Sequence, residues 1–252
     1  MKIVFYNIAF GTGVNGSWTH YINNIWRFVW TSNRALSSIN KTLKKVDGDV
    51  ICLAEVDNGS FRNGFRCQAK AMANHLKYKF FDTQNKYHPS SIWRWMMLLK
   101  NQHDAVLSKK RGLLKKHYLK TGMQKLVTEF ITEGVSIFVV HLAVLSKNAR
   151  SKQLMELSEI LEKCQNPYVV CGDFNIHNGL HEINPFLKKT GVSLVKTNHT
   201  FPSHKPDRTI DLFLTSLDLN VKNFGIIKSL DSDHLPIWIE LENKKTPPIL
   251  NV

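Results

Sequence analysis

Short apolar runs alternate with amphipathic stretches along most of the chain. Apolar runs bounded by turn residues are typical of buried strands, and an apolar spacing of three or four residues is typical of helices that cover a sheet. The first pattern predicts strands at residues 3–8, 50–54, 104–108, 126–130, 135–140, 168–171, 210–214 and 236–241. The second predicts helices at residues 33–45, 65–76, 149–163 and 182–190. Because strands and helices are interspersed throughout, we expect a single layered α/β domain over residues 1–242, followed by a frayed tail at 243–252.

The run at residues 168–171 ends in Gly172-Asp173-Phe174-Asn175. Open α/β sheets place their chemistry beyond the carboxyl ends of their strands. Asp173 could accept a proton or bind a metal ion, and Asn175 could donate hydrogen bonds to a phosphate oxygen. An Asp-capped turn explains the same four residues equally well. The motif therefore indicates a functional site only if similar polar groups also lie at the ends of other strands.

Polar side chains do recur at the ends of the predicted strands. They are Asn7, Glu55, His141, Asp211 and the triplet Ser232-Asp233-His234. Each alone could be a turn residue, a cap, an exposed charge or a buried histidine. Together, the carboxylates and amide supply hard oxygen ligands for a divalent cation such as Mg²⁺, and two histidines can stabilise a phosphoryl transition state or transfer a proton. The joint pattern predicts metal-assisted hydrolysis of a phosphate ester.

These segments, in this order, resemble the endonuclease/exonuclease/phosphatase superfamily, which includes deoxyribonucleases, apurinic endonucleases, sphingomyelinases and inositol polyphosphate phosphatases. The resemblance runs from residue 3 to about residue 241 and rests on Tyr6-Asn7-Ile8, Leu53-Ala54-Glu55-Val56, His141-Leu142, Gly172-Asp173-Phe174-Asn175, Thr209-Ile210-Asp211 and Ser232-Asp233-His234. It implies a four-layer α/β sandwich, in which two mixed β-sheets lie face to face, flanked by helices, with the site at one end.

The resemblance also implies roles for individual residues. Glu55 would be the main Mg²⁺ ligand, assisted by Asn7 and by Asp233, and Mn²⁺ could substitute for Mg²⁺. Three catalytic groups would act on water and phosphate: Asp173 would orient or deprotonate the attacking water, while Asn175 and His234 hold phosphate oxygens. The remaining two would be Asp211, which orients His234, and His141, which lies near the leaving oxygen. The acid that orients His141 is left open between Glu129 and Asp104.

The formal net charge is +14, spread over the whole chain. Such a surface attracts a polyanion, although basic charge also serves solubility alone. Together with His141, the charge favours a nuclease that cleaves nucleic acid by in-line water attack. The alternative is a phosphoesterase that acts on a phospholipid, in the manner of sphingomyelinases or phosphoinositide phosphatases, or on a small phosphorylated substrate, with an acidic membrane surface as a second candidate partner.

Two Trp-rich segments, residues 18–30 and 91–100, bear on that choice. They could pack in the core, stack on bases or enter a bilayer interface. Core packing is the first expectation, because clustered apolar residues are usually buried. A loop at residues 200–208 could form a phosphate-contacting rim through His204, Lys205 and Arg208. The segments leave the substrate class open.

The location of the protein is also an expectation from the sequence. The first predicted strand begins at residue 3, which leaves no room for a signal peptide, and no apolar run approaches membrane-spanning length. The four cysteines show no metal-ligand spacing, so we expect buried thiols in a reducing compartment. These features predict a cytoplasmic protein.

Overall fold

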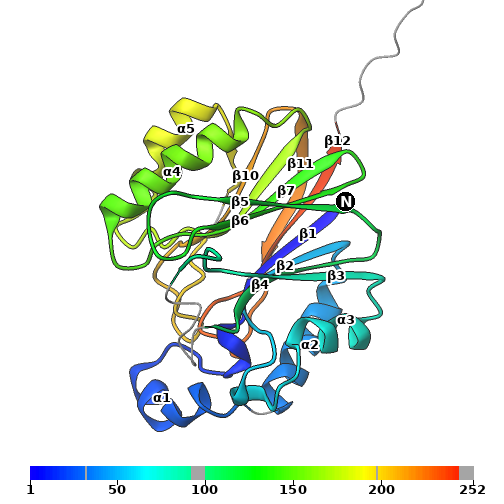
Figure 1. Cartoon of the computed structure of the whole chain (residues 1–252), viewed down its shortest axis with the longest axis vertical. Coiled ribbons are helices and arrows are strands. Elements are labelled where there is room, and N and C mark those ends of the chain that lie inside the picture. Colours follow the sequence, from blue (N-terminus) through cyan, green and yellow to red (C-terminus); the bar gives the residue numbers. More distant parts are fainter. Residues whose placement is uncertain (32, 92–99, 197, 244–252) are drawn as a thin grey trace, which may run out of the picture.

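The computed structural model describes residues 1–31, 33–91, 100–196 and 198–243, which form two six-stranded mixed sheets lying face to face (Figure 1). In the first sheet the strand order is β11 (Leu219–Ile226), β12 (Ile237–Asn243), β1 (Lys2–Asn7), β2 (Val50–Asp57), β4 (Gln102–Ser108) and β3 (Phe80–Asn85). In the second sheet it is β5 (Leu113–Tyr118), β6 (Leu126–Thr132), β7 (Val135–His141), β8 (Tyr168–Asp173), β10 (Asp211–Thr215) and β9 (Ser193–Leu194).

Side-chain alternation along β1 shows how the layers form. Ile3 and Phe5 point into the core between the sheets, whereas Val4 and Tyr6 point outward to the helices. The helices α2 (Asn33–Val46) and α3 (Gln68–Leu76) cover the outer face of the first sheet. The helices α4 (Lys147–Leu161) and α5 (Asn184–Thr190) cover the second sheet. This arrangement confirms the expected four-layer α/β sandwich.

The remaining helical elements are short. They are α1 (Trp18–Asn23) and the 3₁₀ turns η1 (Ala9–Gly11), η2 (Ile25–Phe28), η3 (Phe61–Asn63) and η5 (Leu180–Ile183). In Figure 1, α1 lies at one end of the sandwich, outside both sheets. No helix within the described part of the chain is both long enough and apolar enough to cross a bilayer.

The central strand pairs run parallel and bring polar residues to one end of the sandwich. β1 pairs in parallel with β2, and β7 pairs in parallel with β8. On its other side, β1 pairs antiparallel with β12, with Lys2 opposite Glu240. Because the carboxyl ends of β1, β2, β7 and β8 are therefore grouped, the residues that end these strands come together in space.

The sequence missed four strands, and all four lie at sheet edges: β3 and β11 in the first sheet, and β5 and β9 in the second. An edge strand exposes much of its surface, so its sequence lacks the continuous apolar run that identifies a buried strand. The strand β5, for example, reads Leu-Leu-Lys-Lys-His-Tyr. Of the predicted tail, Asn243 is the last residue of β12, and residues 244–252 lie outside the described part.

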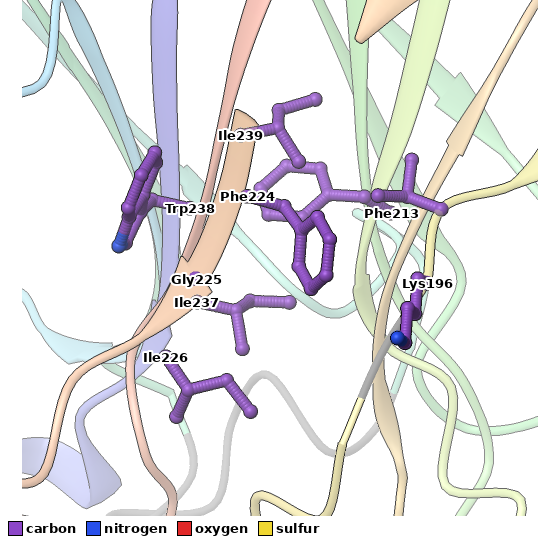
Figure 2. A pocket seen from close by; sticks show the side chains of 9 residues that line it. Lys196, Phe213, Phe224, Gly225, Ile226, Ile237, Trp238 and Ile239 are labelled. Atoms are coloured by element: carbon purple, nitrogen blue, oxygen red, sulfur yellow. The ribbon is translucent and has the colours of Figure 1, made fainter. Parts of the chain in front are cut away.

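A small apolar hollow opens where β10 faces β11 and β12 (Figure 2). Phe213 lines it from one sheet, and Phe224, Ile237 and Ile239 line it from the other. None of the predicted site residues contributes to the lining. The hollow is therefore a feature of the packing between the sheets and not part of the polar site.

Gly172 is required by the close approach of β7 and β8. A Cβ atom at this position would lie 2.0 Å from the carbonyl oxygen of Val140 and 2.6 Å from Val140 Cγ2. We therefore expect Gly172→Ala to destabilise the protein by roughly 3 kcal/mol or more, as measured by urea unfolding. Adding Val140→Ala should not restore stability, because the backbone oxygen remains. Full recovery in the double variant would contradict this explanation.

Candidate active site

The register of the second sheet places three of the predicted residues side by side. His141 ends β7 and lies opposite Asp173, which ends β8. Asp211 begins β10 and lies opposite Asp173 on the other side. Asn7, at the end of β1, reaches the same point from the first sheet, because its Nδ2 donates to Asp173 Oδ2 at 3.2 Å. Asp173 is therefore the point at which the two sheets meet.

His234 and Asp211 form a buried ion pair. Nδ1 of His234 lies 2.9 Å from Oδ2 of Asp211, which also accepts a 2.5 Å hydrogen bond from Oγ1 of Thr200. Burial alone would lower the pKa of His234, but the carboxylates of Asp211 and Asp173 together raise that pKa well above its ordinary value. The imidazolium presents Nε2 to the site, 3.7 Å from Oδ2 of Asp173. The predicted pairing of these residues therefore exists in the structure.

Asp173 is held by hydrogen bonds from both sides. Besides Asn7, the backbone N–H of Asn175 donates to its Oδ1 at 3.0 Å. Burial raises the pKa of Asp173 to about 7, although the nearby His234 cation lowers it. Asn175 has a left-handed backbone with φ of 51°, and its side-chain Nδ2 donates to Leu142 O at 2.9 Å. That amide group carries a second hydrogen, which is available to a ligand.

Glu55 lies at an irregularity in β2. The register between β2 and β4 shifts between Leu53 and Val56, and Glu55 has a φ of 55°. Bulges and positive φ values concentrate at functional sites, because they redirect a side chain at a cost in backbone energy. The carboxylate is 23% exposed and accepts no hydrogen bond from any described residue, so it is free to bind a ligand.

Lys86 is a candidate that the sequence analysis missed. It directly follows β3 and is 1% exposed, with Nζ 3.6 Å from Oε1 of Glu55 and 5.9 Å from the centroid of the Phe10 ring. Within the described residues, Nζ has no hydrogen-bond partner. A buried ammonium is costly unless its hydrogens are satisfied, so this one points to a ligand beside Glu55. In a chain rich in lysine, after an edge strand, no signal in the sequence distinguishes it.

His141 lacks the acid partner that was expected. Glu129 pairs with Nε2 of His117 at 2.9 Å and accepts from Oγ of Ser136, so the assignment of Glu129 is wrong. Asp104 makes no hydrogen bond to His141 among the described residues, and its pKa is raised to about 6, chiefly by burial. Burial, and then the charge of Lys86, lower the pKa of His141 well below its usual range. His141 is therefore a neutral imidazole.

Nε2 of His141 faces carboxylates of the site itself. It lies 3.7 Å from Oδ2 of Asp173 and 3.9 Å from Oε1 of Glu55. Its Nδ1 is buried without a hydrogen-bond partner in the described residues. His141 is thus oriented by its place at the end of β7 and not by a carboxylate behind it.

Asp233 lies at the rim of the site. It accepts hydrogen bonds from the hydroxyl group of Tyr21 and, at 3.2 Å, from Oγ of Ser232. Ligand atoms of Asp173, Asp211 and His234 lie within 4.8 Å of one another, a spacing that suits a metal ion. Since His234 is paired with Asp211, however, the oxygens better suited to a hard cation are those of Glu55, Asn7 and the facing edge of Asp173. The donor set fits a divalent cation.

The segment at residues 18–30 is not core. Trp18, Trp26 and Trp30 are all exposed, so the expectation of core packing is wrong for these side chains. They lie on or beside short helices at the end of the sandwich, where no sheet covers them. Residues 92–99 of the second Trp-rich segment lie outside the part of the chain that the structure describes.

In the predicted rim at residues 200–208, Arg208 lies over the Phe201 ring at 5.8 Å.

Comparison with known proteins identifies the family and supports the fold. Residues 5–234 match the model of the Endonuclease/Exonuclease/phosphatase family. No curated protein sequence gave a significant match. Similar solved structures include a mannosyl-6-phosphatase from Bacteroides thetaiotaomicron, with a TM-score of 0.69 and 16% identity over 96% of this chain and 99% of that chain.

Two further structures share the fold. The human Nocturnin catalytic domain with a bound sulfate anion has a TM-score of 0.66 and 15% identity over 97% of this chain and 93% of that chain. The beta toxin of Staphylococcus aureus has a TM-score of 0.64 and 18% identity over 97% of this chain and all of that chain (100%). At these identities the similarity shows a common architecture.

Proposed function

The chain belongs to the endonuclease/exonuclease/phosphatase family, whose members hydrolyse phosphate esters, and from this premise we propose that it is a Mg²⁺-dependent phosphodiester hydrolase. The observation that carries the proposal is the convergence of Glu55, Asp173 and the His234–Asp211 pair at one end of the sandwich. This places a free carboxylate, a base and a buried cation around one small volume. That combination suits hydrolysis of a phosphate ester by water.

Three residues would act on the attacking water and the phosphate. Asp173, whose pKa is about 7, takes a proton from water near neutral pH. The His234 imidazolium, fixed by Asp211, donates through Nε2 to a phosphate oxygen. His141 is neutral, so it donates a hydrogen bond to the leaving oxygen but does not supply a full charge. The reaction then needs no covalent intermediate with the protein.

Glu55 and Asn7 would hold the metal ion, with Asp173 beside them and Asp233 at the rim. When bound, Mg²⁺ would supply positive charge to the phosphate oxygens and lower the pKa of a coordinated water. Lys86 adds a second positive charge next to Glu55 and is placed to balance the carboxylates in the absence of substrate. The amide of Asn175 contributes its remaining hydrogen to a phosphate oxygen.

Nucleic acid is the first candidate substrate, because the net charge of +14 attracts a polyanion. A membrane phospholipid is the second, favoured by the exposed Trp side chains beside the site. The test is a panel of plasmid, single-stranded DNA, RNA, sphingomyelin vesicles and phosphoinositide vesicles, each with Mg²⁺ or with EDTA. Activity that requires Mg²⁺ and disappears in the His141→Ala variant supports the proposal. Activity of the purified protein that is unaffected by EDTA and equal in the wild type and His141→Ala would refute it.

The pH dependence of kcat/KM should be bell-shaped. It should rise through about pH 7 as Asp173 loses its proton, because the carboxylate form is the base. It should fall at higher pH as His234 loses its proton, since the pKa of this group is raised well above its ordinary value. In Asp211→Asn the loss of a negative charge lowers the pKa of His234, so the alkaline limb should move to lower pH. An unmoved limb would show that another group titrates there.

A further inference from the structure

Eight large apolar side chains are exposed on or beside α1, η2 and η3. Of these elements, α1 lies at one end of the sandwich (Figure 1). Trp18 is 77% exposed, and Phe65 is 74% exposed. Folded proteins rarely leave so many large apolar groups together in water unless something binds there. We call this surface the aromatic platform, and it comprises Trp18, Ile22, Ile25, Trp26, Val29, Trp30, Phe61 and Phe65.

The two segments that carry the platform are in contact with each other. The rings of Trp30 and Phe61 lie 5.6 Å apart in an edge-on contact, and those of Phe61 and Phe65 lie 6.3 Å apart. Both the backbone N–H and the hydroxyl group of Thr31 donate to Arg62 O, which joins the two segments. Along α1, Trp18 and Ile22 are four residues apart and so share one side of the helix.

The chain segments that carry the platform contain cations but no carboxylates of their own. The sequence contains no Asp or Glu from residue 1 to residue 46, nor from residue 58 to residue 81. Both stretches contain several Lys and Arg residues, and Arg34, Arg66 and Lys70 are exposed there. Of the neighbouring carboxylates, Asp57 pairs with Arg62 and Asp233 accepts from Tyr21. An apolar face edged by cations is complementary to a surface that is apolar inside and anionic outside.

From these observations we infer that the aromatic platform docks onto an anionic lipid bilayer. Indole rings favour the bilayer interface, where an apolar body can be buried while the N–H stays hydrated. Single-stranded nucleic acid is a poorer fit, because the aliphatic side chains of Ile22, Ile25 and Val29 offer no face for base stacking. A second copy of the chain is also a poorer fit, because it would bring the same positive charge to the interface.

Docking would bring the catalytic site to the membrane. The hydroxyl group of Tyr21 in α1 donates to the carboxylate of Asp233, which directly precedes His234. This hydrogen bond links the helix that carries part of the platform to the rim of the site. The inference concerns attachment and not catalysis, so it goes beyond the proposed reaction and can be tested without turnover.

The test is vesicle co-sedimentation with the full-length Asp173→Asn protein, in which hydrolysis cannot alter the lipid. We expect binding to vesicles that contain phosphatidylserine and much weaker binding to vesicles of phosphatidylcholine alone. Replacing Trp18 and Ile25 together by Ser should weaken binding roughly tenfold or more, because two large apolar groups no longer enter the interface. The control is Leu113→Ser on the edge strand β5, which removes an exposed apolar side chain elsewhere and should leave binding unchanged.

Other outcomes would overturn the inference. Equal vesicle binding by wild type and the Trp18→Ser/Ile25→Ser variant would exclude the platform, provided that both proteins melt at the same temperature. Loss of single-stranded DNA binding in that variant, without vesicle binding by the wild type, would make the platform a nucleic-acid surface. A dimer that dissociates in the variant would make it a self-association surface. Vesicle binding needs no catalysis, so a wild type that does not bind vesicles would contradict the docking but not the proposed reaction. Conversely, a wild type that binds vesicles but hydrolyses no substrate would contradict the reaction but not the docking.

Discussion

Asp173→Asn should lower kcat by about 1,000-fold or more, with the fold intact. The substitution keeps the size of the side chain but removes the base and the negative charge that faces Nε2 of His234. The drop should appear mainly in kcat, because the proton transfer that Asp173 performs belongs to the transition state. The measurement is steady-state hydrolysis of a soluble phosphodiester at pH 8, where the wild-type carboxylate is ionised.

The control for this result is Asp218→Asn, which changes an exposed carboxylate between β10 and β11 and should leave kcat unchanged. Unfolding curves should show that both variants retain the native structure. If Asp173→Asn kept more than about a tenth of wild-type kcat, the base would have to be another group. His141, which is neutral and 3.7 Å from Asp173, would then be the first to examine.

Glu55→Gln should cost about 100-fold to 1,000-fold in kcat/KM and should shift the Mg²⁺ concentration needed for half-maximal activity upward. An amide keeps one oxygen at the position but loses the negative charge that a hard cation prefers. A second readout needs no substrate. Mg²⁺ should raise the melting temperature of the wild type, and this shift should shrink in Glu55→Gln, since a ligand that binds the native state stabilises it.

Glu133→Gln serves as the matched control, because that carboxylate pairs with Lys110 on the surface, far from the site in the fold. Its Mg²⁺ response should equal that of the wild type. Equal phosphoesterase activity in the wild type and in Glu55→Ala would instead indicate a protein that keeps the fold without using its site. A full Mg²⁺-induced shift in Glu55→Gln would place the cation elsewhere.

The interior of both sheets could be predicted from the sequence, because buried strands carry their own signal. The strands with neighbours on both sides each contain an apolar run, as in β1 and β8, whereas the edge strands β3 and β5 mix polar or charged residues with apolar ones. Locating a strand in the sequence also locates the residue at its end, so the positions of Asn7, His141 and Asp173 could be predicted together with their strands. The adjacency of His141 and Asp173 follows from parallel pairing, whereas Asn7 approaches Asp173 from the other sheet.

What the sequence could not supply were facts that depend on three-dimensional packing. Burial of Lys86 depends on Glu55 and Phe10, which are distant in sequence. The exposure of Trp18 and Phe65 could not be predicted, because a cluster of apolar residues has the same sequence pattern whether it is buried or exposed. The partner of Glu129 proved to be His117 on the neighbouring strand β5, an edge strand whose sequence gave no sign of its presence.

The position of β1 has a consequence for folding during synthesis. This strand lies between β2 and β12, so one of its two neighbours is synthesised about 230 residues after it. Until β12 emerges, a nascent chain has an open edge on β1, and His234 is not fixed opposite Asp211. Hydrolysis of phosphate esters is therefore expected only after residues 237–243 have been synthesised and have paired with β1.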